Sequence, residues 1–209
     1  MEAAQPGRRE RRRVELRERI LQEAIALFET QGYETTTVTE IAERADIAYG
    51  TFFNHFPSKH DLLREVSEQT MGELFRDVAR RHELPGTFAE HLVSLFEESA
   101  EEAERVGPQK RELLRAMMAL AFSEGPRSDD RRVRRAFRAF LEQGRASSAV
   151  RDDVDLDTLT DIVVGTWYSM FLSWVNDDAY PLRQRAAAAG RFLAKVCRAG
   201  TELGNQETK

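Results

Sequence analysis

The sequence predicts an all-α protein. Apolar residues recur mostly at spacings of three and four, which is the period of an amphipathic helix. All six prolines fall between these apolar stripes, where helices end. Several stripes also begin with the residue pair of a helical capping box, a serine or threonine three residues before a glutamate. These pairs are Thr37 with Glu40, Thr87 with Glu90 and, as a near match, Ser58 with Asp61.

About nine helices are expected. The first carries a stripe from Leu16 to Phe28 and ends at Gly32, where a glycine can adopt a positive φ. Two short helices follow at about 38–45 and 49–56, and a longer one at 58–82. The remaining stripes begin at Phe88, Leu113, Val133, Leu156 and Leu182. Threonines give residues 33–39 some strand character, but a lone strand would have no partner.

The composition excludes several classes of protein. With 209 residues, 41% of them hydrophobic, the chain can bury a substantial core and is too apolar to be disordered. A single cysteine excludes an internal disulfide and a cysteine-cluster metal site, and we expect neither metal nor cofactor. The uncharged apolar run 162–176 is shorter than the about 20 residues of a membrane helix. The arginine-rich start lacks the apolar core of a secretory signal, so a soluble, cytoplasmic protein is expected.

The N-terminal segment differs from the rest of the chain in the sign of its net charge. The formal net charge is −5, yet seven arginines and three glutamates between Arg8 and Arg19 make that segment +4. A local basic patch can meet a phosphate backbone while the remaining surface is acidic. A solvated helix surface with ion pairs is the alternative interpretation.

Residues 36–63 predict two short helices joined by the tight turn Asp46-Ile47-Ala48. Ile41 and Ala42 lie on the apolar side of the first helix. On the second helix we expect packing or supporting roles for Phe52, Phe53, His55 and Phe56. His55 is expected to be a hydrogen-bonded residue and not a metal ligand. Such a pair is a helix-turn-helix, whose second helix can enter the major groove of DNA.

The same segment resembles the DNA-binding domain of the tetracycline-repressor (TetR) family of bacterial transcriptional regulators. That domain has the pattern F-x-x-x-G-[YF], T-[TS]-[VM]-x-x-I-A, a turn, and G-[TS]-[LF]-Y-x-H-F-x-x-K-x-x-L. The matching residues here are Phe28, Gly32, Tyr33, Thr36, Thr37, Val38, Ile41, Ala42, Gly50, Thr51, Phe52, His55, Phe56, Lys59 and Leu62. The chain departs from the pattern at Asp46, Ala48 and Phe53. Asp46 must then adopt a turn conformation, Ala48 cannot cap the second helix, and Phe53 lacks a hydroxyl for phosphate.

The resemblance implies a double-stranded DNA operator as partner and assigns roles to individual residues. Tyr49 and Asn54 would reach base edges, Gly50 would allow close backbone approach, and Thr51 would offer a hydroxyl to phosphate or base. Phosphate contacts would come from the helix beginning after Thr37, from Lys59 and from Arg44. Arg11, Arg12 and Arg13, within the basic segment 8–13, would lie along DNA or reach a minor groove.

The remainder of the chain resembles the family only in architecture, which implies a larger helical domain that binds a small molecule and dimerises. The last two helices, from Leu156 and Leu182, would form half of an intermolecular four-helix bundle in a homodimer. Aromatic and methionine side chains would line the effector site and favour an apolar or aromatic molecule. These candidates are Phe96, Met117, Leu120, Phe137, Trp167, Tyr168 and Phe171.

The predicted domains are 1–57, the helix-turn-helix with its arginine-rich arm, and 58–209, the effector-binding and dimerisation domain. The leading hypothesis is a dimeric repressor that an effector releases from a palindromic operator. One alternative is a helical small-molecule-binding or adaptor protein that has lost DNA binding. A helical enzyme is the other, although the inward Glu-x-x-His pairs of a di-iron site and the common catalytic motifs are missing from the sequence, and no catalytic residue is assigned.

Overall fold

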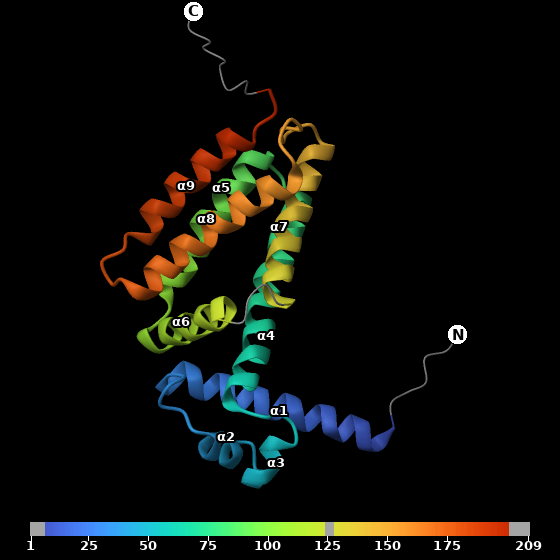
Figure 1. Cartoon of the computed structure of the whole chain (residues 1–209), viewed down its shortest axis with the longest axis vertical. Helices are drawn as coiled ribbons and strands as arrows, with labels where there is room; N and C mark the ends of the chain where they lie inside the picture. The colour runs from blue at the N-terminus through green and yellow to red at the C-terminus, as the bar shows by residue number, and fades with distance from the viewer. Residues whose placement is uncertain (1–6, 124–127, 201–209) are drawn as a thin grey trace, which may run out of the picture. The chain divides into compact units, whose positions relative to one another are not determined.

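The computed structural model describes residues 7–123 and 128–200, and within these ranges it confirms the all-α prediction (Figure 1). Nine α-helices and one short 3-10 helix account for the regular structure there, beside a single isolated bridge between Val150 and Arg198. The α-helices are α1 (Arg8–Gln31), α2 (Val38–Arg44), α3 (Tyr49–Phe53), α4 (Lys59–Arg80), α5 (Phe88–Arg105), α6 (Pro108–Ser123), α7 (Ser128–Ala146), α8 (Leu156–Asn176) and α9 (Leu182–Cys197). The 3-10 helix η1 (Arg81–Glu83) follows α4 directly.

The chain divides into two compact units. The first contains the residues up to 69 together with 107–120, and the second contains 70–106 and the residues from 121 onward. The first turns of α4 and most of α6 therefore belong with the N-terminal helices. The boundary at 57/58 stays a prediction about domain organisation, because this division is one of compactness alone.

The core of the first unit is built from the apolar faces of its helices. Ile20, Ala24 and Phe28 of α1 are completely buried, as are Ile41 of α2 and Phe52 of α3. At the end of α1, Gly32 has a φ of 93°, and its N–H donates to the carbonyl of Phe28 at 3.1 Å. The predicted glycine stop is thus confirmed.

The second unit is organised around the packing of α9 on α5 and of α7 on α8. Gly190 permits the first of these contacts, because a Cβ atom built on it would lie 3.2 Å from the Cα of Val93 and 3.3 Å from the Cβ of Phe96. The absence of a side chain at Gly190 therefore lets α9 approach α5 closely.

Gly144 of α7 allows a similarly close approach. A Cβ atom there would lie 2.5 Å from Val150 Cγ2 and 2.6 Å from Phe88 Cδ2. We expect Gly144→Ala to lower the free energy of unfolding by about 1–3 kcal/mol, since overpacking outweighs the gain in helix propensity. Chemical denaturation measures this change. In Gly72→Ala the atom nearest to the new Cβ would be 3.9 Å away, so the gain in helix propensity should raise the free energy of unfolding by about 0.5–1 kcal/mol. Equal stability of the Gly144 variant and the wild type would contradict the packing argument.

Arg151 connects the loop before α8 to the end of α9. Its side chain is 6% exposed, and its Nε donates to Asp153 Oδ1 at 2.6 Å. Nη1 donates to the carbonyl of Val196 at 3.2 Å, and the backbone N–H of Arg151 donates to the carbonyl of Cys197 at 2.8 Å. Burial raises the pKa of the Cys197 thiol to about 11, so the thiol stays protonated in this packing.

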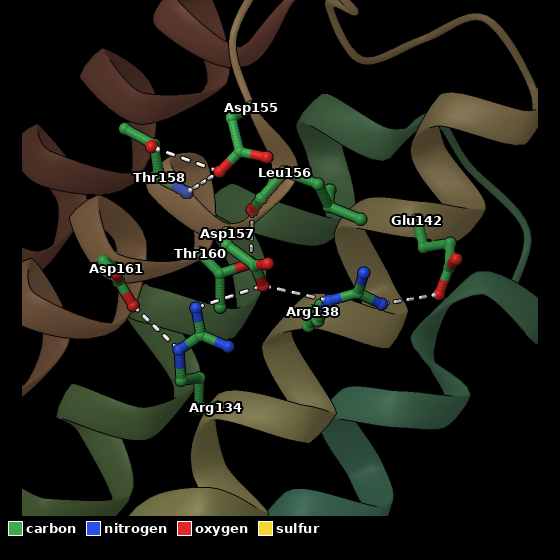
Figure 2. A network of polar contacts seen from close by, with 9 residues as sticks. All are labelled: Arg134, Arg138, Glu142, Asp155, Leu156, Asp157, Thr158, Thr160 and Asp161. Atoms are coloured by element: carbon green, nitrogen blue, oxygen red, sulfur yellow. Dashed lines mark hydrogen bonds and ion pairs between the residues drawn. The ribbon is translucent and has the colours of Figure 1, made fainter.

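A network of polar contacts joins α7 to the first turns of α8 (Figure 2). Arg134 bonds Asp161 at 2.8 Å and Asp157 at 3.1 Å, and Arg138 bonds the same Asp157 at 3.1 Å. Asp155 caps α8 by accepting from the N–H of Thr158 at 2.9 Å. Aspartates at a helix N-terminus also meet the positive end of the helix dipole, so the network fixes where α8 begins.

The pH dependence of stability should show this network. Hydrogen bonds from Arg138 and then Arg134 hold the pKa of Asp157 below its ordinary 3.8. The carboxylate therefore stabilises the fold above that pH, and the contribution is lost as the pH falls through the lowered pKa. We expect Asp157→Asn to be slightly less stable than wild type at neutral pH and equally stable in acid, as urea unfolding at several pH values would show. Asp152→Asn, an exposed aspartate outside the network, is the control. A stability gap that is constant with pH would contradict this account.

Candidate nucleic-acid interface

The first helix of the helix-turn-helix is held by the predicted capping box. The Thr37 hydroxyl accepts from the N–H of Glu40 at 3.2 Å, and the Glu40 carboxylate accepts from the N–H of Thr37 at 2.7 Å. These bonds lower the pKa of Glu40, which keeps the carboxylate charged. The N-terminus of α2 therefore already carries a negative group. The predicted phosphate contact there stays a prediction, and the phosphate would have to share this end with Glu40.

The turn between the two helices has the geometry that its residues predict. Asp46 has a φ of 51°, a left-handed conformation that aspartate tolerates better than most residues. The N–H of Ile47 donates to the carbonyl of Ala42 at 3.0 Å, which closes the end of α2. Ala48 stands at the N-cap of α3 without a side-chain hydrogen bond, as its side chain requires.

The recognition helix is shorter than predicted and carries its aromatic residues on two faces. Phe52 and Phe56 are fully buried, with ring centroids 5.8 Å apart. Phe53 packs only in part, because it is 40% exposed while its ring contacts that of Phe52 at 5.3 Å. The helix ends at Phe53 instead of 56, and Asn54 occupies its C-cap. A five-residue helix has one turn to bury, and Phe52 already occupies that face.

The outward face of α3 contains most of the predicted base-contacting residues. Tyr49 is 55% exposed, Gly50 and Asn54 are exposed, and Thr51 is half-buried. A Cβ atom on Gly50 would have no neighbour within 4 Å, so space around it remains open to an incoming backbone or base. These side chains form a surface without charged groups, because α3 contains no acidic or basic residue.

Lys59 braces the chain before the helix-turn-helix. Its ammonium donates to the carbonyls of Tyr33 at 2.8 Å, Thr36 at 2.9 Å and Glu34 at 3.4 Å. It also lies 4.3 Å from the ring centroid of Tyr33, a cation–π contact. The predicted phosphate contact of Lys59 stays a prediction, and it would require the ammonium to leave these carbonyls.

Arg17 of α1 braces the end of the recognition helix. Its guanidinium forms a two-point contact with Glu65, at 2.6 and 3.2 Å, and donates to the carbonyl of His55. It also lies 4.2 Å from the ring centroid of Phe56. Neither Arg17 nor Glu65 was singled out from the sequence, because the pair is 48 residues apart and belongs to no local motif.

His55 has a different environment from the one expected. Its Nδ1 atom is buried, and within the described part of the chain it has no hydrogen-bond partner, although a hydrogen-bonded ring was predicted. Burial first, and the positive charges of Arg13 and Arg17 second, lower the pKa of the imidazole. His55 is therefore neutral at physiological pH. No cluster of three or more potential metal ligands occurs among the residues that the structure describes.

The basic candidates lie on exposed helix surfaces. Residues 8–13 form the first turns of α1 and are exposed, so they are helical in this structure. Arg44, at the end of α2, bonds Glu23 of α1 at 2.9 Å and remains more than half exposed. The arginines of residues 8–13 and Arg44 therefore keep positive charge exposed at the surface of the first unit.

The effector candidates are distributed over both units. Phe96, Phe137, Trp167 and Phe171 are buried in the second unit, where Tyr168 is half-buried. Trp167 contacts three of the aromatic rings, with centroids 4.5 Å from Phe171, 5.4 Å from Tyr168 and 6.4 Å from Phe137. Its indole N–H is buried without a hydrogen-bond partner in the described residues. Met117 and Leu120, on α6, are buried in the first unit.

The last two helices keep apolar side chains at the surface. Ile162 of α8 is 45% exposed and Phe192 of α9 is 65% exposed. The rest of the apolar surface of α8 is largely used inside the unit, where Val163, Trp167 and Val175 are buried. None of the helices in the two described ranges is long and apolar enough to cross a membrane.

The first helix is capped, the turn is tight, and the short second helix is exposed on one face and packed against the core on the other. These features define a helix-turn-helix protein. Residues 20–66 match the family model described as "Bacterial regulatory proteins, tetR family". The chain belongs to this TetR family, whose members are transcriptional regulators and not enzymes. The family expected from the motif and the helical fold are thus confirmed.

Individual relatives extend the likeness beyond the N-terminal helices. The HTH-type transcriptional repressor KstR2 of Mycolicibacterium smegmatis is 28% identical over 160 residues, which cover 74% of this chain and 77% of that protein. The regulator TcmR of Streptomyces glaucescens is 46% identical over 57 residues, but the match spans only 27% of this chain and 25% of TcmR. FadR of Thermus thermophilus, a TetR-family repressor solved with lauroyl-CoA, has a TM-score of 0.65 at 27% identity over 92% of this chain and 98% of its own.

Proposed function

We propose that this protein is a dimeric repressor that binds a palindromic DNA operator and leaves it when a small apolar or aromatic molecule binds. The observation that carries the proposal is the exposed, uncharged outer face of α3, fixed from behind by the buried rings of Phe52 and Phe56. A helix presented in this way fits the major groove. The repressor KstR2, matched over most of both chains, supports the direction of regulation.

The contacts with DNA divide into two groups. Tyr49, Gly50, Thr51 and Asn54 meet the base edges and the phosphates beside them. Arg44 and the exposed arginines 11–13 meet the backbone, where they add affinity without sequence preference. Thr37 and Lys59 contribute mainly by holding the turn and the start of α4 in place, given the bonds that they already make.

The dimer forms through α8 and α9, whose exposed Ile162 and Phe192 would be covered by the second copy. A two-fold dimer presents two recognition helices, which explains why the operator should be a palindrome. The opposite, small-residue side of α9 is already used against α5. The partner copy therefore meets the side that carries Phe192.

The effector binds in the second unit, around the aromatic cluster of Trp167, Phe137 and Phe171. The unpartnered indole N–H supports a bound acceptor atom there, because burying such a donor alone costs about 1–3 kcal/mol. The lauroyl-CoA complex of Thermus thermophilus FadR supports an effector with an apolar chain, although the coenzyme A part of that ligand is charged. Release requires the effector to favour a conformer whose recognition helices no longer fit the operator. α4 is the proposed lever, since it contributes residues to both units.

Binding-site selection from random duplex DNA, followed by a salt titration of the best sequence, tests the proposal. We expect an enriched near-palindrome, with half-sites about one or two helical turns apart, and an affinity that falls steeply with salt. A folded protein that enriches no sequence would favour the adaptor that has lost DNA binding. An effector that bound the dimer without changing its DNA affinity would contradict the release mechanism alone.

A further inference from the structure

Two aromatic rings form an exposed apolar edge on α3. Both side chains are large and aromatic, yet Tyr49 is 55% and Phe53 is 40% exposed. They stand four residues apart, one helical turn, with ring centroids at 5.1 Å and an interplanar angle of 69°. The ring of Phe53 also contacts the fully buried Phe52, at 5.3 Å and 81°. The edge is therefore supported by the core.

The chemistry of this edge limits what it can recognise. Guanine is usually recognised by arginine or lysine, and α3 contains neither. The phenyl ring of Phe53 can neither donate nor accept a conventional hydrogen bond. Among the base edges in the major groove, the apolar feature is the C5 methyl group of thymine.

We propose that Phe53, with Tyr49 beside it, recognises thymine methyl groups in each half of the operator. This inference rests on the proposed function, because it assumes that α3 enters the major groove. It names the base that the apolar edge selects and adds Phe53, which the sequence assigned to packing, to the specificity-determining residues. Asn54 and the Tyr49 hydroxyl provide the polar contacts beside it.

Replacing thymine by deoxyuridine tests the proposal directly, since uracil lacks the methyl group but keeps the same base pairing. Each thymine of the operator obtained by selection is changed in turn, in both half-sites together. At one or two positions per half-site we expect the Kd to rise about fourfold per methyl group, and therefore more than tenfold for the symmetric pair. At the other thymines the Kd should stay within twofold.

Variants assign the effect to the ring. Phe53→Ala should bind the thymine and the uracil operators about equally, whereas Phe53→Tyr, which keeps a ring, should retain the difference. Arg44→Ala is the matched control, because loss of a backbone contact weakens binding to both operators by the same factor. The uracil series on the wild-type protein needs no variant and stays informative if Phe53→Ala fails to fold.

The outcomes separate this inference from the function on which it rests. A selection that yields no operator, with the protein folded, overturns the DNA-binding function itself. An enriched operator in which no uracil weakens wild-type binding overturns thymine recognition and leaves the repressor intact. Retention of the full methyl effect in a folded Phe53→Ala protein overturns the role of Phe53.

Discussion

Replacing Lys59 by methionine is expected to lower the free energy of unfolding by about 1–3 kcal/mol and to weaken operator binding without changing its salt dependence. The stability loss follows from the three backbone carbonyls that the ammonium caps, at 2.8, 2.9 and 3.4 Å, since hydrogen bonds to charged groups are the stronger ones. The affinity loss follows because these carbonyls lie in the segment that leads from α1 into α2. Urea denaturation and DNA titrations at several salt concentrations measure the two effects.

Lys110→Met provides a matched control. It removes the same charge from the same unit, but Lys110 makes an exposed ion pair, with Glu29 at 3.0 Å. Its loss should cost less than about 1 kcal/mol. One result would contradict the bracing role. The Lys59 variant would be as stable as the wild type, but its slope of log affinity against log salt would be smaller by about 0.9 for each phosphate contact removed. It would instead support the phosphate contact that the sequence predicts.

Phe192→Glu is expected to convert the proposed dimer to a monomer and to weaken binding to the full operator by at least about a hundredfold. The phenyl ring is 65% exposed on α9, and a carboxylate at that place would be buried without a partner in the dimer. The loss of affinity is large because the second half-site contact becomes intermolecular when the dimer is lost. Analytical ultracentrifugation and titrations with full and half operators measure both changes.

Leu84→Glu is the control for the dimer variant. Leu84 is 55% exposed, follows η1 and lies outside α8 and α9. The same change of charge there should leave the dimer and its operator affinity intact. A Phe192 variant that stays dimeric would exclude this part of α9 from the interface. Dissociation of both variants would show instead that the added charge acts without regard to position.

Local signals in the sequence predicted the fold and the turn geometry well. Thr37 with Glu40 forms its capping box because all of its atoms lie within one helical turn. Asp46 takes a positive φ because the chain must reverse there and no glycine is available. Features of this kind depend on neighbours in sequence, so spacing alone reveals them.

Contacts between distant segments could not be predicted in the same way. Lys59 matched a motif, but the motif does not say that its ammonium meets carbonyls more than twenty residues earlier. Phe53 looked like its neighbour Phe52, but adjacent residues of a helix point in different directions, and only the packing of α3 on the core decides which ring is buried. Gly190 permits a close helix contact, but only the packing of the second unit shows that the partner is α5.

The brevity of α3 has an evolutionary consequence. An isolated five-residue helix without a capping side chain does not persist, so burial of Phe52, with Phe56 directly after the helix, maintains its shape. Exposed positions contribute little to stability, and substitutions there usually change it by less than about 0.5 kcal/mol. Residues 49, 50 and 54 can therefore vary while the fold is maintained. A descendant of this protein could acquire a new operator by a few point mutations, and selection would act on those positions through the genes it controls.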